Sequence, residues 1–380
     1  MEASSLAVQE IWDQVLNHLA AHRDLKSCAL VCRAFVSSAQ TLLFHYVHTH
    51  LAGRRSFPHV DGRRPPLTMS TDRLADFASQ APHLIDHIRE LSIDGCDAET
   101  LAPIVEIPWS RLRAIAFEHA GSRDTGPLAA DASALIGALV ALPTLREISF
   151  SAFYFGSELP AILAKCGAQV CSLNFDYSYI LDTALTHADA PLPLDPGYPR
   201  PRITSLRMWM AGAIPDFIHS ATSPLDLSQL NNISYVANTG ILPLLHGSKN
   251  TVRTLEFYGK EPDIESLDFG AFPALSHIKF WDGAKGLAKA FESSSPLIHL
   301  HTISYSLHGR NLNIMTLPLL DSLVSNSVSK LSALRQVVVQ LTAPAYKPGH
   351  EELRSAIEKQ VPWLVQNGLL VIEITRLERN

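Results

Sequence analysis

Two cysteine pairs are spaced so that they could form half of a metal site. Cys28 and Cys32 lie four positions apart and would share one face of a helix. No second Cys or His pair has matching spacing, and cysteine is readily buried, so we interpret the pair as core residues. Cys166 and Cys171 flank a predicted helix-to-strand turn and receive the same interpretation.

Three histidines, His45, His48 and His50, cluster near the end of a predicted helix. His45 and His48 would share a face and could ligate a metal. No carboxylate or cysteine lies close by in the sequence, and a cationic imidazole is favourable at a helix C-terminus. We therefore expect a solvated helix end and no metal.

Catalytic motifs are missing from the sequence. It holds no phosphate-cradling glycine loop, no nucleophile elbow and no HExxH motif. The acidic residues are spread along predicted loops and strands without a convincing acid/base pair. We expect no catalytic residues and no cofactor. An enzyme whose site follows no known motif stays the alternative.

Composition narrows the possible partners and compartments. The net charge of −6 over 380 residues argues against nucleic acid as a partner. The first residues lack the features of a signal peptide, no apolar run reaches about 18 residues, and five cysteines suit a reducing compartment. We expect no membrane contact and a cytoplasmic or nuclear location.

The elements that would position any site follow a six-residue template: apolar, any, any, apolar, any, apolar. It recurs eleven times, with its middle residues 22 to 35 positions apart, close to the 20–29 residues of leucine-rich repeats. The matches are Ile88-Leu91-Ile93, Leu112-Ile115-Phe117, Leu145-Ile148-Phe150, Val170-Leu173-Phe175, Ile203-Leu206-Met208, Leu230-Ile233-Tyr235, Val252-Leu255-Phe257, Leu275-Ile278-Phe280, Leu300-Ile303-Tyr305, Leu334-Val337-Val339 and Leu369-Ile372-Ile374.

Alternation at the last two template positions predicts a short strand, and the segments between the strands look helical. Asp131 would cap one such helix. We predict an α/β fold in which residues 71–380 form a leucine-rich-repeat-like solenoid of about eleven strand units, with a parallel sheet on the concave face and helices outside. No regular Asn or Cys follows the strands. An ordinary α/β domain with short strands is the alternative.

The residues that point away from the core would line the open face. The position after each template unit is acidic early, at Asp94 and Glu118, and aromatic later, at Trp209, Tyr258 and Trp281. Exposed aromatic residues beside charges are typical of interaction hot spots. Unless a C-terminal segment or loop covers the rings, we expect a protein substrate to bind there. The predicted substrate-binding residues are Arg207, Trp209, Glu256, Tyr258, Lys279 and Trp281.

The N-terminal residues 4–47 have a different pattern, with apolar residues at helical spacing. Three short helices are expected, the third over about Val36–Val47. So few residues cannot bury much surface alone, so the helices should dock on the solenoid, on a partner, or on both. Residues 48–70, which are rich in Gly, Arg and Pro, read as a linker or loop, and a helix should follow over about 71–81.

The same segment resembles an F-box of fungal type. Leu6, Glu10, Ile11 and Trp12 match the pattern Leu-Pro-x-Glu-Ile-Trp with one extra residue before Glu10, and Ala7 stands where the family has Pro. The pattern Leu-Val-Cys-Arg-x-Phe is matched from Leu30 to Phe35. The other matching positions are Val15, Leu16, Leu19, Leu25, Leu43 and Phe44. The departure at Ala7 falls on a residue that, in the family, touches the adaptor.

This resemblance implies a substrate receptor of a Skp–cullin–F-box ubiquitin ligase. The partners would be a Skp-type adaptor, through it a cullin, and a protein substrate whose identity the sequence does not give. A repeat scaffold without ligase association, in which the helices only cap the stack, is the alternative. The residues implied for the three-helix module and its adaptor-facing surface are Leu6, Ile11, Val15, Leu16, Leu19, Leu25, Val31, Cys32 and Phe35.

Overall fold

The computed structural model describes most of the chain. The described residues are 10–16, 18–19, 22–31, 33–50, 66–119, 128–181, 200–220, 223–236, 241–258, 267–281, 284–308, 314–344 and 349–377. Its contacts form two compact units, Met1–Pro201 and Arg202–Asn380. Both units combine parallel strands with helices, so the predicted α/β class is confirmed.

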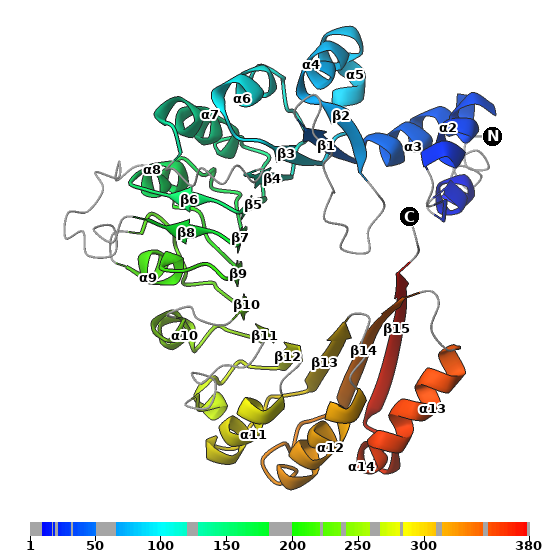
Figure 1. Ribbon diagram of the computed structural model, residues 1–380, viewed down its shortest axis with the longest axis vertical. Helices are drawn as coiled ribbons and strands as arrows, with labels where there is room; N and C mark the ends of the chain where they lie inside the picture. The colour runs from blue at the N-terminus through cyan, green and yellow to red at the C-terminus, as the bar shows by residue number, and fades with distance from the viewer. Residues whose placement is uncertain are drawn as a thin grey trace, which may run out of the picture. The chain divides into compact units, whose positions relative to one another are not determined.

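Unit 1 begins with helices and continues as alternating strands and helices (Figure 1). Residues 10–16 are helical. The elements that follow are α2 (His22–Val31), α3 (Arg33–Phe44), β1 (Tyr46–His50), β2 (Leu67–Ser70), α4 (Thr71–Gln80), α5 (Pro82–Ile85), β3 (Glu90–Asp94), α6 (Ala98–Val105), β4 (Ala114–Glu118), α7 (Ala130–Val140), β5 (Glu147–Ser151), β6 (Tyr154–Phe155), α8 (Glu158–Ala164), β7 (Ser172–Asp176) and β8 (Tyr179–Ile180).

Unit 2 repeats the alternation. Its elements are β9 (Ser205–Trp209), α9 (Ile214–His219), β10 (Asn232–Val236), α10 (Leu242–Ser248), β11 (Thr254–Tyr258), η3 (Phe269–Ala271), β12 (His277–Trp281), α11 (Ala284–Ser293), β13 (Thr302–His308), η4 (Ile314–Thr316), α12 (Leu317–Asn326), β14 (Gln336–Pro344), α13 (His350–Gln360), α14 (Pro362–Gln366) and β15 (Leu370–Leu377). Figure 1 shows helices α9–α12 together on one side of these strands.

In all eleven template matches the second and third residues lie on a strand, and the first lies one or two residues before it. In unit 1, β3, β4, β5 and β7 pair in chain order, and the middle template residues Leu91, Ile115 and Ile148 lie opposite one another. In unit 2, β9 to β15 also pair in chain order, and Leu206 aligns with Ile233 at the start of the series. The template therefore predicted both the strands and, up to β14, their register.

The pairing departs from the template at both ends. Val337 of β14 lies opposite Leu370 rather than Ile372, so β15 is shifted by two residues and keeps the same face. At the other end, β1 lies between β2 and β3, so the first two strands do not follow chain order.

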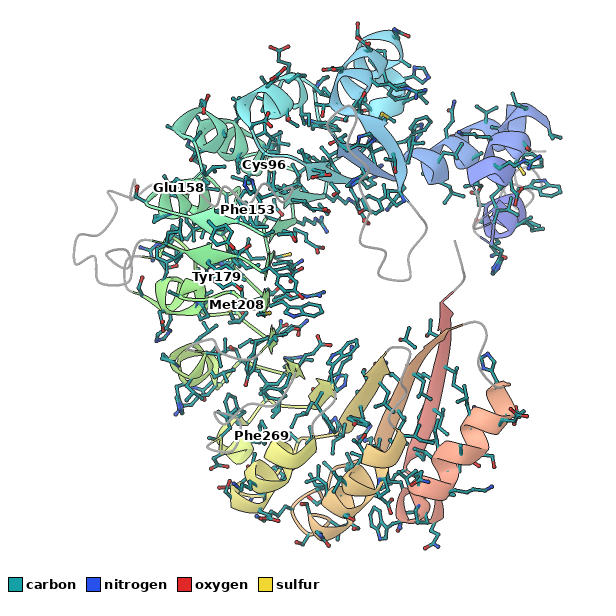
Figure 2. The ribbon with its side chains drawn as sticks, viewed as in Figure 1. Cys96, Phe153, Glu158, Tyr179, Met208 and Phe269 are labelled. Carbon is teal, nitrogen blue, oxygen red and sulfur yellow. The ribbon has the colours of Figure 1, made fainter. Side chains whose placement is uncertain are left out.

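The core of each unit lies between the strands and the helices. The second and third template residues are fully or almost fully buried from β3 to β14. Their aromatic side chains stack from strand to strand: the rings of Phe117 and Phe150 are 5.5 Å apart, and those of Phe150 and Phe175 are 5.6 Å apart. Phe153, labelled in Figure 2, adds an edge contact to Phe150 at 5.5 Å. Stacked apolar side chains of this kind stabilise units too small to fold alone.

The turns after several strands pass through the left-handed region of the backbone. Gly95 follows β3 with φ 94°, Ala152 follows β5 with φ 61°, and Tyr177 follows β7 with φ 52°. The amide of Gly95 donates to the Glu118 carbonyl, and that of Ala152 donates to the Asp176 carbonyl. These backbone bonds continue the ladder past the strand ends, where the sequence lacks a regular capping Asn.

Three local expectations were wrong. The segment 48–70 is not a loop at its ends, since Tyr46–His50 and Leu67–Ser70 are strands that pair with each other; residues 51–65 are outside the described part. The third N-terminal helix ends at Phe44, because Val47 is buried in β1. Asp131 lies inside the first turn of α7, where Ala129 is the N-cap.

Candidate functional site

The N-terminal helices have a small core of their own. Leu16, Leu25 and Leu43 are almost fully buried, and partly buried apolar side chains pack around them: Leu19, Cys28, Phe35, Leu42 and Phe44. Helix α3 also docks on the following helices, since Phe44 stacks on Phe77 of α4 at 5.1 Å between ring centres. The expected docking of these short helices on the rest of the chain is therefore observed.

A second set of apolar side chains on the same helices faces solvent. Ile11 is 59% exposed, Leu30 88% and Val31 73%, and Trp12 and Val15 are also exposed. The Trp12 ring meets Phe35 edge-on at 4.9 Å, which joins the exposed residues to the small core. Large apolar side chains that are exposed on neighbouring helices are candidates for contact with a partner. We call Ile11, Trp12, Val15, Leu30 and Val31 the N-terminal apolar patch.

The burial of these side chains divides the residues predicted for adaptor binding into a buried or half-buried group and an exposed group. Leu16, Leu25, Leu19 and Phe35 contribute to the module's own core, whereas Ile11, Val15 and Val31 belong to the exposed patch. Leu6 and Cys32 lie outside the described residues. Trp12 and Leu30 were missed, although both match the family pattern, because sequence alone does not separate packed from exposed apolar positions.

The predicted substrate-binding residues of unit 2 lie on neighbouring strands. Glu256 of β11 and Lys279 of β12 are directly opposite, and Lys279 Nζ is 2.8 Å from Glu256 Oε1. Trp281 Nε1 donates to the same oxygen at 2.9 Å. Lys279 also lies over the Trp281 ring, 4.8 Å from its centre. The parallel register therefore produces one connected group of three side chains, which we call the β11–β12 cluster.

Arg207 and Trp209 form a second pair on β9, with the guanidinium 5.2 Å from the ring centre. The side chain of Tyr258 lies outside the described part, although its backbone is in β11. The rings of Trp209 and Trp281 are half-buried. Of the acidic positions expected on the open face of unit 1, Glu118 is half-buried but Asp94 is buried, so the early face is less exposed than predicted.

Electrostatics bind the β11–β12 cluster together. Burial alone would raise the pKa of the Glu256 carboxyl, but the hydrogen bond and charge of Lys279, with the Trp281 indole, outweigh it and lower that pKa below its ordinary value. The carboxylate is thus ionised at neutral pH. In this cluster the Lys279 ammonium lies over the Trp281 ring while both side chains pair with the Glu256 carboxylate.

A buried polar row in unit 1 resembles a catalytic arrangement at first sight. Ser92 Oγ donates to Glu118 Oε1 at 2.8 Å and lies 2.9 Å from His48 Nδ1. A serine nucleophile must pass its proton to the histidine, yet here the hydroxyl points to the carboxylate. Ser92 and His48 are fully buried, so the row stabilises the sheet and leaves no access for a substrate. His48 is in a strand and not at the solvated helix end that we expected.

Cysteines and possible metal ligands are further candidates for chemistry among the described residues. Within them, no group of three or more His, Cys, Asp or Glu side chains is arranged to hold a metal ion. Cys166 is buried as expected, and burial raises the pKa of its thiol to about 12, which suppresses the reactive thiolate. Cys28 packs against the N-terminal core.

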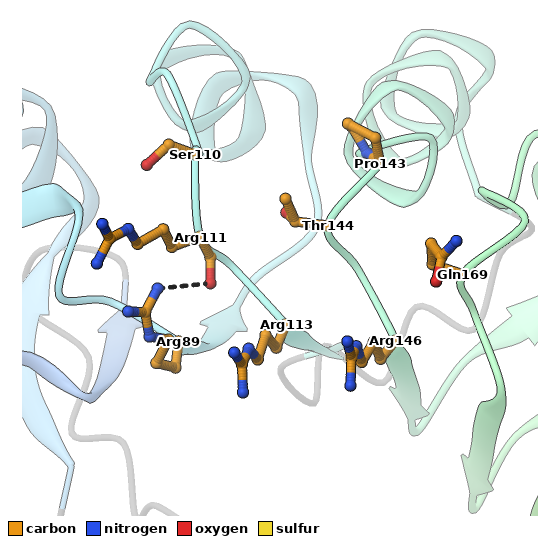
Figure 3. Close-up of a pocket in the computed structure, with 8 residues that line it drawn as sticks. All are labelled: Arg89, Ser110, Arg111, Arg113, Pro143, Thr144, Arg146 and Gln169. Atoms are coloured by element: carbon orange, nitrogen blue, oxygen red, sulfur yellow. Dashed lines mark hydrogen bonds between the residues drawn. The ribbon is translucent and has the colours of Figure 1, made fainter.

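One further group was not predicted. Arg89, Arg111, Arg113 and Arg146 line a pocket of about 520 Å³ in unit 1 (Figure 3). A signal was available in the sequence: Arg89, Arg113 and Arg146 each lie directly before a template strand, in three successive units.

Comparisons with known proteins do not extend this description. No family model matches the chain, and no curated protein matches it. Among the helices of the described residues, none is both long and apolar enough to cross a membrane.

Proposed function

We propose that this protein is the substrate-recognition subunit of a Skp–cullin–F-box ubiquitin ligase. The observation that supports this most is the N-terminal apolar patch. Ile11, Val15 and Val31 match the F-box pattern and are exposed, while Leu16 and Leu25 of the same pattern hold the helices together. A module that folds with its own core and keeps a second apolar surface in solvent is suited to bind another subunit.

The strand and helix units would hold the substrate. We propose that they form a repeat array of the leucine-rich type, because the template units pair in chain order and in register within each unit. Open strand faces of such arrays are wide binding surfaces. The β11–β12 cluster, with Arg207 and Trp209, combines indole rings and charges on that face and is our candidate for the substrate contact.

The mechanism would be proximity rather than bond chemistry. The adaptor and a cullin would bring the ubiquitin-carrying enzyme to a substrate held on the strands. The receptor would raise the effective concentration of the acceptor lysines and take no part in the transfer itself. It would therefore need no catalytic residue, metal or cofactor, and it would act in the cytoplasm or nucleus, where these ligases work.

The test is binding of a purified Skp-type adaptor to the full chain. We expect Ile11→Asp together with Val31→Asp to weaken binding at least about 100-fold. A charge at either position prevents burial of an apolar side chain that contributes roughly 1.5–3 kcal/mol. Isothermal titration calorimetry measures the affinity, and circular dichroism checks that the helices stay folded, as expected for residues outside the core.

The matched control is Ser37→Asp, which adds the same charge at an exposed position of α3. It should leave the affinity unchanged. If the folded wild-type chain does not bind the adaptor, or if the double variant binds as well as the wild type, the ligase proposal is wrong. A repeat scaffold without ligase association would then be the better description.

A further inference from the structure

The arginines of unit 1 form a row imposed by the sheet register. Residues 89, 113 and 146 precede β3, β4 and β5 and occupy equivalent positions, because Glu90 lies opposite Ala114 and Ala114 opposite Glu147. The amide of Arg113 donates to the carbonyl of Arg89 at 2.7 Å, and that of Arg146 to the carbonyl of Arg113 at 2.7 Å. Neighbouring strands lie about 4.8 Å apart, so three cationic side chains leave the backbone at that spacing.

A fourth arginine and three loops complete the pocket. Arg111 lies in the loop before β4, and Nη1 of Arg89 donates to its carbonyl at 3.2 Å, which fixes the Arg89 guanidinium. Figure 3 shows the side chains of Arg89, Arg113 and Arg146 on the same side of the chain segments that lead into β3, β4 and β5. Ser110, Thr144 and Gln169 supply polar groups to the walls. The volume of about 520 Å³ is that of a small-molecule site.

The positive charge of this pocket is balanced only in part, since Asp86 is a carboxylate whose charge acts on Arg89. Among the described residues, the side chains of Arg111, Arg113 and Arg146 make no ion pair or hydrogen bond. The carboxylate of Asp86 also accepts a hydrogen bond from Ser110. The two acids that follow the row in sequence are engaged elsewhere, Glu90 with His45 at 3.4 Å and Glu147 with Asn174 at 3.1 Å.

Partial burial and repulsion from Arg111 and Arg113 lower the pKa of Arg89, although a guanidinium still stays charged at neutral pH. Arg111, Arg113 and Arg146 are exposed, so water and salt screen much of their repulsion, whereas a polyanion between the four guanidinium groups would be attracted by all of them. Guanidinium groups donate two parallel hydrogen bonds, which match the oxygens of a phosphate.

We infer that this pocket binds a small anion that carries two or more phosphate groups. One phosphate cannot reach both ends of a row that spans two strand intervals, or about 10 Å. A row of three arginines with loops beside it also suits a small ligand better than a nucleic-acid strand, which needs a longer basic stripe. The site lies within unit 1, and the inference does not depend on adaptor binding or on the β11–β12 cluster.

The test uses inorganic tripolyphosphate as the probe and the full chain as the receptor. Calorimetry should find one site, and Arg113→Gln should weaken it about 10- to 100-fold, because each charge-assisted hydrogen bond contributes strongly to affinity. The affinity should fall as salt rises, since the interaction is ionic. Inorganic phosphate should bind more weakly than tripolyphosphate.

Unit 2 offers a matched control. Arg253 and Arg335 also directly precede strands, β11 and β14, but Asn231 and Ser276 flank Arg253 in the register. Arg253→Gln should leave tripolyphosphate binding unchanged. Arg113→Gln should fold with the thermal stability of the wild type or slightly more, because it removes repulsion. A structural role for Arg113 would instead lower that stability.

Three results would overturn the inference. The first is no binding of tripolyphosphate at about 1 mM, a weak limit for a built site. The second is equal weakening by Arg113→Gln and Arg253→Gln, which would mean that only overall charge matters. The third is much tighter, Arg113-dependent binding of a doubly phosphorylated peptide or a short RNA, which would assign the pocket to a macromolecule.

Discussion

The β11–β12 cluster makes a pH-dependent prediction about stability. Replacing Glu256 by Gln keeps the size of the side chain and an oxygen for the Trp281 indole, but it removes the charge opposite Lys279. At the observed separation of 2.8 Å, two unit charges attract by about 6 kcal/mol at an effective dielectric of about 20, and by about 1.5 kcal/mol in bulk water. The side chains are 19% exposed for Glu256 and 25% for Lys279, so the environment lies between these limits.

Two costs reduce that gross attraction. Both groups lose part of their hydration, and two flexible side chains are held in one geometry. In the variant, the partly exposed Lys279 can turn toward water, so no buried charge is stranded. We therefore expect Glu256→Gln to lower the free energy of unfolding by about 1–2 kcal/mol at pH 7.

The sign of the pH dependence follows from the lowered pKa of Glu256. The contribution of a carboxylate whose pKa is lower in the folded state is present above its ordinary value, near 4.5, and is lost as the pH falls through the folded pKa. Protonated Glu resembles Gln. The difference between the wild type and the variant should thus persist at pH 6 and shrink at pH values below about 4.5.

Urea unfolding followed by tryptophan fluorescence measures this difference at several pH values. Glu292→Gln, at an exposed position of α11, is the control and should change little at any pH. A penalty for Glu256→Gln that is equal at pH 7 and pH 3.5 would refute the reasoning, because it would come from something other than the ion pair. An equal penalty for Glu292→Gln would do so as well.

Two further predictions concern local structure. The carboxylate of Asp321 in α12 accepts hydrogen bonds from the amides of Trp363 and Leu364 and so caps α14. Asp321→Ala should lower the free energy of unfolding in urea by about 1–2 kcal/mol, and an unchanged urea midpoint would contradict this cap. Ala152 is held at φ 61° after β5, a conformation that glycine adopts more easily than alanine. Ala152→Gly should therefore stabilise unit 1 by up to about 1 kcal/mol in thermal unfolding, and a clear loss of stability would show that this backbone is not strained.

The strand ladder could be predicted because its signal is local and repeated. Each template match places two apolar residues on one face of a strand, and each such pair is buried from β3 to β14. The strand β1 escaped prediction for the opposite reason. Its sequence, Tyr-Val-His-Thr-His, has one aliphatic residue, and its buried His48 is stabilised by Ser92 of β3, which a local pattern cannot reveal.

The candidate binding residues were only partly predictable, because exposure depends on the tertiary partner. Ile11 and Leu16 lie on the same helical segment and both are apolar, yet one is 59% exposed and the other almost fully buried. Helical periodicity gives a common apolar face, and only the packing of α2 and α3 decides which part of that face stays open. The pairing of Glu256 with Lys279 likewise depends on the register of β11 and β12.

The register also explains why a series of parallel strands can hold sites that the six-residue template does not include. In parallel strands aligned in chain order, residues at one offset from the template lie side by side, whatever the number of residues between the strands. An offset that repeats a charge in successive units therefore builds a row, as it does at Arg89, Arg113 and Arg146. The same offset at Arg253 gives an isolated side chain, because its neighbours are Asn231 and Ser276. Comparing equal offsets in adjacent units, rather than residues close in sequence, is what would have found the arginine pocket.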